Sequence, residues 1–183
     1  MIRTVYVYGS PVLRKVAQNI TPDYPQLEAL IVDMFETMEQ SDGIGLAAPQ
    51  IGLSVRLFVV DGTPLADDDP TLKEFRKVFI NAQIIEQFGD KVIYNEGCLS
   101  LPGLHEDVER ESKIRIRYHD EKFVEHEEVY GGMAARIIQH EHDHLDGILF
   151  TDRVSPIRKQ LLRSKLNAIA KGKFNASYKC RIG

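Results

Sequence analysis

The stretch from Met133 to Gly147 reads MAARIIQHEHDHLDG and contains the pattern HExxH at His140, Glu141 and His144. No turn-forming residue interrupts it before Gly147, so it predicts a helix of about four turns that ends at a glycine. Residues four positions apart lie on one face of a helix, so both imidazoles can bind one metal ion while Glu141 lies beside it. The stretch therefore predicts a metal-binding helix at the centre of the fold.

A catalytic metal site of this kind needs a third protein ligand. No glutamate or histidine follows the motif, and the longer pattern HExxHxxGxxH fails where Phe150 replaces the last histidine. Asp146 and Asp152 remain open as ligands, although both lie close to the helix end. The best upstream candidate is Cys98 in NEGCLSLP, because thiolates bind metals strongly and Cys/His₂ sites are catalytic. The competing interpretation of a lone cysteine is a small buried apolar residue.

The sequence before this motif predicts a helix, a glycine loop and a buried strand. Apolar residues recur with helical spacing from Pro25 to Ser41. The helix leads into SDGIGLAAPQIG, where Gly43 and Gly45 predict an ordered loop with unusual backbone dihedrals. The run VRLFVVDG, residues 55–62, then predicts the strand.

Strands dominate the middle of the chain, and helices follow them. Residues 77–130 have a β pattern, as in Ile114–Tyr118, where apolar and basic residues alternate. A helix is predicted from Ser155, its N-cap, through Pro156 to about Lys171. The fold class is therefore α+β, with mainly antiparallel sheets packed around the HExxH helix, an N-terminal helix and a C-terminal helix.

Composition is that of an ordinary soluble globular protein with one domain. The 183 residues are 43% hydrophobic and 27% charged, which excludes collagen-like, low-complexity and disordered chains. A net charge of −4 is too mild for a general nucleic-acid or membrane binder. Two cysteines are not the disulfide framework of a secreted scaffold. No targeting segment and no long apolar run is found, so a cytoplasmic location without membrane contact is expected.

Three segments together resemble those of the peptide deformylases. They are GIGLAAPQ at 43–50, EGCLS at 96–100 and QHEHDHLDG at 139–147, in the expected order over most of the first 150 residues. The resemblance implies that the metal ligands are Cys98, His140 and His144. It implies Fe²⁺ as the usual ion, with Zn²⁺, Ni²⁺ or Co²⁺ able to replace it.

The resemblance also implies a reaction and its catalytic groups. The reaction is hydrolysis of the N-terminal formyl-methionine of newly synthesised polypeptides, which releases formate. Glu141 is then the general base and acid. The side-chain amide of Gln50 and the backbone N–H of Leu99 are then the donors to the oxyanion.

The substrate is expected to bind against the glycine loop as an added strand. The methionine side chain needs an apolar pocket, although core packing is the competing interpretation for Ile44 and Ile137. Glu96 is predicted to form a supporting hydrogen bond rather than to act as a base. The residues predicted to contact or support the substrate are Gly43, Ile44, Gly45, Tyr94, Glu96 and Ile137.

The remaining histidines are not predicted to bind the metal. On a helix, His142 points away from the side that carries His140 and His144, so a surface or supporting position is expected. Solvated positions are expected for His105, His119 and His126. Many deformylases carry an arginine that helps hold the peptide a few residues after the motif cysteine, whereas this chain has His105 in that vicinity, so the resemblance leaves substrate affinity and peptide preference open.

Charge divides the chain into an acidic part and a basic part. Residues 153–183 carry 9 Lys and Arg and no Asp or Glu, which leaves 23 − 9 = 14 basic and 27 acidic residues in 1–152. We expect one domain, made of a catalytic deformylase part, 1–152, and a basic C-terminal helix and tail, 153–183. The helix is predicted to bury Leu161, Leu162, Leu166 and Ile169 and to expose Lys159, Arg163 and Lys165. One interpretation is a solvated helix with a frayed end, and the other is contact with ribosomal RNA.

Three other functions remain open at this point. The chain could be a metallopeptidase, or an enzyme that uses Cys98 as a nucleophile with a histidine base. It could also be a ribosome-binding module whose metal is only structural. We expect a monomer that acts on formylated nascent peptides. Cys180 has no predicted role.

Overall fold

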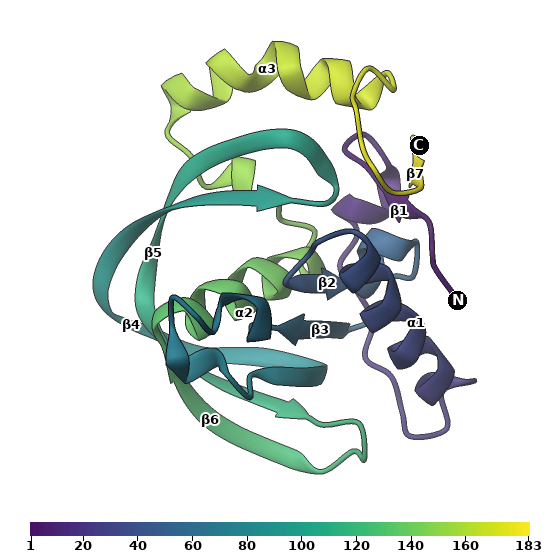
Figure 1. The fold of residues 1–183 in the computed structure, drawn as a ribbon, viewed down its shortest axis with the longest axis vertical. Coiled ribbons are helices and arrows are strands. Elements are labelled where there is room, and N and C mark those ends of the chain that lie inside the picture. Colours follow the sequence, from purple (N-terminus) through teal and green to yellow (C-terminus); the bar gives the residue numbers. More distant parts are fainter.

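A five-stranded antiparallel sheet, in the order β2-β3-β4-β5-β6, surrounds helix α2 in the computed structural model, which describes residues 1–183 (Figure 1). The helices are α1 (Leu27–Gln40), α2 (Gly132–Leu145) and α3 (Pro156–Ala170). The strands are β1 (Val5–Tyr6), β2 (Gly45–Ala47), β3 (Leu57–Asp61), β4 (Arg76–Cys98), β5 (Leu101–His119), β6 (Glu125–Gly131) and β7 (Cys180–Arg181). The α+β class predicted from the sequence is confirmed.

Strands β4 and β5 form a long curved hairpin around one side of α2 (Figure 1). Their register shifts at several points, among them Ile80/Gln83 and Phe88/Lys91. Such irregularities bend a strand and increase its twist. The curvature brings the far end of β4, with Cys98, back toward the helix that carries the HExxH motif.

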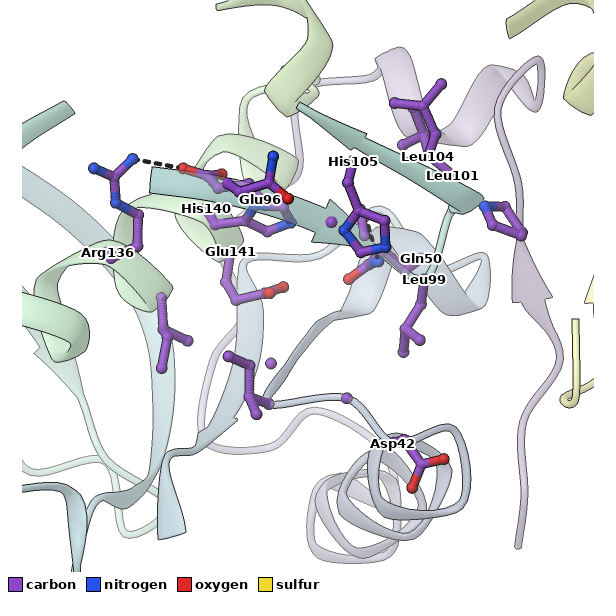
Figure 2. Close-up of a pocket in the computed structure, with 18 of the residues that line it drawn as sticks. Asp42, Gln50, Glu96, Leu99, Leu101, Leu104, His105, Arg136, His140 and Glu141 are labelled. Carbon is purple, nitrogen blue, oxygen red and sulfur yellow. Dashed lines mark hydrogen bonds and ion pairs between the residues drawn. The ribbon is translucent and has the colours of Figure 1, made fainter. Parts of the chain in front are cut away.

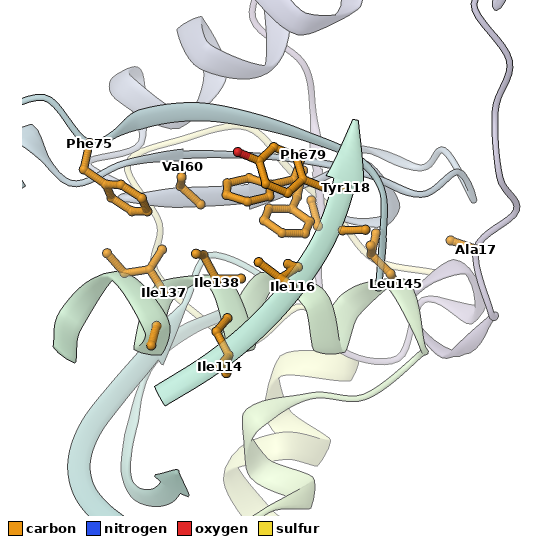
Figure 3. Packing of buried hydrophobic residues seen from close by; sticks show 14 of the residues in the cluster. Ala17, Val60, Phe75, Phe79, Ile114, Ile116, Tyr118, Ile137, Ile138 and Leu145 are labelled. Carbon is orange, nitrogen blue, oxygen red and sulfur yellow. The ribbon is translucent and has the colours of Figure 1, made fainter. Parts of the chain in front are cut away.

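Helix α2 is buried because its apolar side chains face the sheet on one side, while on the other sides polar side chains such as Arg136, Gln139 and Asp143 form hydrogen bonds. Ile137, Ile138 and Leu145 pack against Ile116 and Phe79 of the sheet (Figure 3). Fully burying one such side chain stabilises the fold by about 1.5–3 kcal/mol. The helix therefore holds its histidines on a rigid support.

The end of α2 follows the sequence prediction. Gly147 adopts φ +72°, and a Cβ there would lie 2.7 Å from the carbonyl oxygen of Arg14. Only glycine satisfies both demands.

Helix α1 leads into the glycine loop, where one expectation is wrong. Neither Gly43 nor Gly45 has a positive φ, and Gly45 begins strand β2. The positive φ values in this region belong to Asp42 (55°) and Gly52 (88°). The glycine at position 45 is needed for space, because a side chain there would collide with Glu141.

Helix α3 lies along the outside of the β4–β5 hairpin (Figure 1). The Ser155 side chain accepts a hydrogen bond from the N–H of Arg158, so the predicted N-cap is present. Leu162 and Ile169 are buried, but Leu161 is 62% exposed, contrary to prediction. Leu161 comes one residue before the buried Leu162. One residue along a helix corresponds to a rotation of about 100°, so the Leu161 side chain points away from the buried face.

The tail beyond α3 is tied to the start of the chain. Strand β7 pairs in parallel with β1, through Cys180 with Val5 and Arg181 with Tyr6. The frayed end considered for this segment is therefore not found. None of the helices combines the length and apolar character needed to cross a membrane.

Candidate active site

Three metal-ligating side chains meet between β4 and α2. The ligand atoms of Cys98, His140 and His144 all lie within 4.8 Å of one another, and Cys98 Sγ is 3.4 Å from His144 Nε2. One thiolate and two imidazoles around a common point form the donor set of catalytic Cys/His₂ metal sites. The residues therefore fit a divalent metal ion, with a coordination position left over.

The two aspartates left open as ligands are engaged elsewhere. Asp146 pairs with Arg56 at 2.8 Å, and Asp152 pairs with Arg14 at 2.5 Å. Neither belongs to the group of ligands, so the third ligand comes from upstream, at Cys98.

Glu96 orients one of the histidines from a buried position. Its Oε1 lies 2.8 Å from Nδ1 of His140, which leaves Nε2 of His140 available to a metal. The Glu96 carboxylate also accepts hydrogen bonds from Arg110 Nε at 2.7 Å and from Arg136 Nη1 at 2.8 Å. Burial alone would raise the pKa of Glu96, but the bonds from His140 and Arg110 hold that pKa well below its usual value.

Glu141 has no partner. Its side chain is buried, and Oε2 makes no hydrogen bond. Burial raises the pKa of Glu141 to about 7. A Cβ on Gly45 would lie 2.7 Å from Glu141 Cδ, so glycine at position 45 makes room for this carboxylate. The glycine loop and the motif helix are therefore fitted to each other.

Gln50 directs its amide nitrogen toward the cysteine. Its Oε1 accepts a hydrogen bond from the N–H of Ala47 at 2.9 Å, which fixes the orientation of the amide. Its Nε2 lies 3.4 Å from Cys98 Sγ and 3.2 Å from Ser100 Oγ. A donor beside a hydrolytic metal site can stabilise negative charge on a carbonyl oxygen.

These side chains line one cavity of about 400 Å³, within the usual range for small-molecule sites. Glu141, Leu99 and Gln50 lie around it, below His140 and Glu96 (Figure 2). Of the sequence-predicted site residues, all but the buried His144 line this cavity: Gly43, Ile44, Gly45, Gln50, Tyr94, Glu96, Cys98, Leu99, Ile137, His140 and Glu141.

The wall also contains residues that the sequence did not single out. They include Leu101, Leu104, Met133, Arg136 and Tyr178. No sequence motif marks Leu101 or Leu104, and only their burial at the start of β5 places them in the wall. No sequence pattern indicated Tyr178, because it lies in the C-terminal tail, far along the chain from the motifs of the site.

The other histidines differ in part from expectation. His105 is exposed, as predicted, but it also lines the cavity and stands over Gly97. His142 is buried rather than superficial, with Nε2 3.3 Å from Arg56 Nη2. His119 and His126 are half-buried, and His126 pairs with Asp120 at 2.7 Å. The packing of the β5–β6 hairpin covers part of both rings.

Comparison with known proteins agrees with this site. The family model described as Polypeptide deformylase matches residues 2–160. The chain belongs to the peptide deformylase family. The prediction made from the three motifs is confirmed, and the chain is a metallohydrolase with a Cys/His/His metal site.

Other deformylases are similar over almost the whole chain. A peptide deformylase of Christiangramia forsetii is 52% identical, over 100% of this chain and 96% of the relative. One of Flavobacterium johnsoniae is 47% identical with the same coverage. The solved structure of the Plasmodium falciparum deformylase has a TM-score of 0.83 at 36% identity, over 92% of this chain and 96% of that chain. The deformylase of Thermotoga maritima has a TM-score of 0.77 at 39% identity, over 85% and 99%.

Proposed function

We propose that this enzyme hydrolyses the formamide bond of N-formyl-methionyl peptides and uses Fe²⁺ held by Cys98, His140 and His144. The observation that carries the proposal is that the three ligands and the unpaired carboxylate of Glu141 share one cavity. When bound, the ion supplies a Lewis acid that makes water more acidic and polarises the formyl carbonyl. Zn²⁺, Ni²⁺ or Co²⁺ would serve the same ligands.

We infer that Glu141 moves the proton. The Glu141 carboxylate takes a proton from the attacking water and passes it to the departing nitrogen, without which the amine is a poor leaving group. Glu141 lines the cavity and its buried Oε2 has no partner, so no hydrogen bond within the protein holds the carboxylate away from this role. The products are formate and a peptide with a free amino terminus.

Two donors stabilise the charge that develops on the formyl oxygen. We assign them to Nε2 of Gln50 and to the backbone N–H of Leu99. The bond from Ala47 to Gln50 Oε1 supports the first assignment, because it turns the amide nitrogen toward Cys98. One such donor contributes about 10²–10³ in rate.

The methionine side chain occupies the apolar part of the cavity. Ile44 and Ile137 form its wall, Tyr94 lies at the rim, and Gly43 and Gly45 allow the peptide backbone to approach as an added strand. Tyr94 is 42% exposed, which suits a residue at an entrance. His105 lines this path in the region where many deformylases carry an arginine, and we propose that it alters peptide affinity rather than the chemistry.

Anaerobic purification with metal analysis tests the proposal. Iron-loaded protein is expected to release formate from a formyl-methionyl peptide while leaving internal peptide bonds intact, which excludes a metallopeptidase. Chelation is expected to abolish the activity, and added metal to restore it, which excludes Cys98 as a nucleophile. Oxygen should inactivate the iron form, because Fe²⁺ and the thiolate both oxidise. Absence of formate from iron-loaded protein would contradict the proposal.

We also propose that the basic helix α3 contacts ribosomal RNA near the emerging chain. Lys159, Arg163 and Lys165 are exposed on α3, and residues 153–183 contain no acidic side chain that would oppose phosphate. All groups of the site come from one chain, so we propose that the enzyme acts as a monomer.

Charge reversal at Lys159, Arg163 and Lys165 is expected to reduce the amount of enzyme that pellets with ribosomes. The remaining association is expected to depend less on salt concentration. A matched control reverses three exposed lysines elsewhere, Lys15, Lys73 and Lys122, with the same change in net charge. Equal pelleting of both variants would refute the contact through α3.

A further inference from the structure

The turn that follows Cys98 does not have the form that its length favours. Leu99 and Ser100 are the two residues between β4 and β5. Two-residue hairpin loops usually adopt primed turns, which require a positive φ at one or both positions. Neither Leu99 nor Ser100 has a positive φ. The hairpin is irregular here, because its register shifts between Gly97 and Cys98, and contacts from outside the hairpin also reach this turn.

Three such contacts are present. The carbonyl oxygen of Ser100 accepts a hydrogen bond from the N–H of Tyr8 at 2.8 Å, and Ser100 Oγ lies 3.2 Å from Gln50 Nε2. The carbonyl oxygen of Leu99 accepts a hydrogen bond from the hydroxyl of Tyr178 at 2.8 Å. Tyr178 also lines the catalytic cavity. The far end of the chain thus reaches the residue next to a metal ligand.

The tail holds Tyr178 in place through the strand that follows it. The N–H of Val5 donates to the carbonyl of Lys179 at 2.8 Å, and the N–H of Val7 donates to the carbonyl of Arg181 at 3.0 Å. These bonds fix the backbone immediately after Tyr178. Its hydroxyl is therefore presented by an ordered strand pair, not by a loose end.

A bond to the Leu99 carbonyl limits the motion of the Leu99 N–H. Each peptide unit is planar, so only φ and ψ of Leu99 separate the plane that carries its N–H from the plane that carries its carbonyl. Fixing the second plane restricts the first. A donor to an oxyanion is effective only when it is already oriented before the charge develops.

We propose that Tyr178 is a positioning residue for deformylation, and that the C-terminal tail completes the oxyanion site through it. The hydroxyl of Tyr178 holds the Leu99 carbonyl, and the Leu99 N–H is thereby kept in line with the formyl oxygen. This inference rests on the proposed function, in which the Leu99 N–H is a donor.

Tyr178→Phe tests the inference, because it removes the hydroxyl and keeps the ring. The kcat for a formyl-methionyl peptide is expected to fall about tenfold, less than the 10²–10³ lost with a whole donor. KM is expected to change little, because the methionine pocket is untouched. Amide hydrogen exchange in the segment that contains Leu99 is expected to become faster. Tyr24→Phe is the control, since Tyr24 packs against the apolar cluster that includes Leu27 and Leu30 and does not line the cavity.

The outcomes separate this inference from the proposed function. A wild-type enzyme without formate release would overturn the proposed function and the inference together. An active wild type with unchanged kcat in Tyr178→Phe would overturn the inference alone, whether or not KM rises. A lower kcat that follows loss of the metal would also overturn it, because Tyr178 would then act on Cys98. A lower kcat supports the inference if Tyr178→Phe keeps its full metal content and has the same thermal midpoint as the Tyr24→Phe control.

Discussion

Glu141→Ala should lower kcat for formate release by about 10²–10⁴-fold, the range that a positioned general acid and base contributes. The metal should stay bound, because Glu141 is not one of the three ligands. The carboxylate makes no hydrogen bond through Oε2, so its removal leaves no partner unsatisfied. Formate release and metal content, measured on the same preparation, check both parts of this prediction.

The stability of Glu141→Ala should not fall with its activity. A buried polar group without a hydrogen bond costs free energy in the folded state. Removing the Glu141 carboxylate should therefore keep or raise the thermal midpoint, as is common when a catalytic residue is replaced. The matched control is Glu121→Ala, at an exposed glutamate. Full activity of Glu141→Ala with metal bound would instead favour a purely structural metal site.

The motif helix and its ligands could be predicted because they depend on local spacing. The positions of His140 and His144 on one helix face follow from the helical repeat alone. Cys98 could be proposed because few other ligands were left in the sequence. The glycine at position 45 was predicted correctly as special, but for the wrong reason, since a contact with Glu141 requires it rather than a positive φ.

What the sequence could not provide comes from contacts between distant segments. The β1–β7 pair joins the two ends of the chain, and neither two-residue strand has a recognisable pattern. Tyr178 lies 79 positions from Leu99, so no periodicity links them. Arg110 occupies an inward position of β5, where alternation alone would predict an apolar residue. The carboxylates that surround it explain why it is charged.

Arg110 is the centre of a buried ionic cluster behind the metal ligands. Its side chain is 2% exposed. Its Nε and Nη2 donate to Glu96 at 2.7 and 3.0 Å, and its Nη1 donates to Asp143 at 2.9 Å. Asp143 also accepts from Arg153 Nε at 2.6 Å. Glu96 in turn holds Nδ1 of His140, so this one guanidinium supports His140 through Glu96.

Arg110→Met should lower the free energy of unfolding by about 3–5 kcal/mol, because it leaves two buried carboxylates with fewer partners. For a chain of this size, each kcal/mol corresponds to about 2–4 °C in the thermal midpoint. Metal affinity should also fall, by about 10–100-fold, because Glu96 loses two of the bonds that orient it toward His140. Denaturant unfolding of the metal-free protein and metal titration measure the two effects separately.

Arg117, which forms an exposed ion pair with Glu127, supplies the control for this prediction, because it lies on β5 as Arg110 does. Arg117→Met removes the same charge from a side chain that is 49% exposed, so it should cost only about 0–1 kcal/mol and leave metal affinity unchanged. The contrast isolates burial as the cause, since both variants replace one arginine by one methionine. Equal losses of stability in the two variants would contradict the stabilising role of the Arg110 cluster, and equal metal affinities would contradict its support of the metal site.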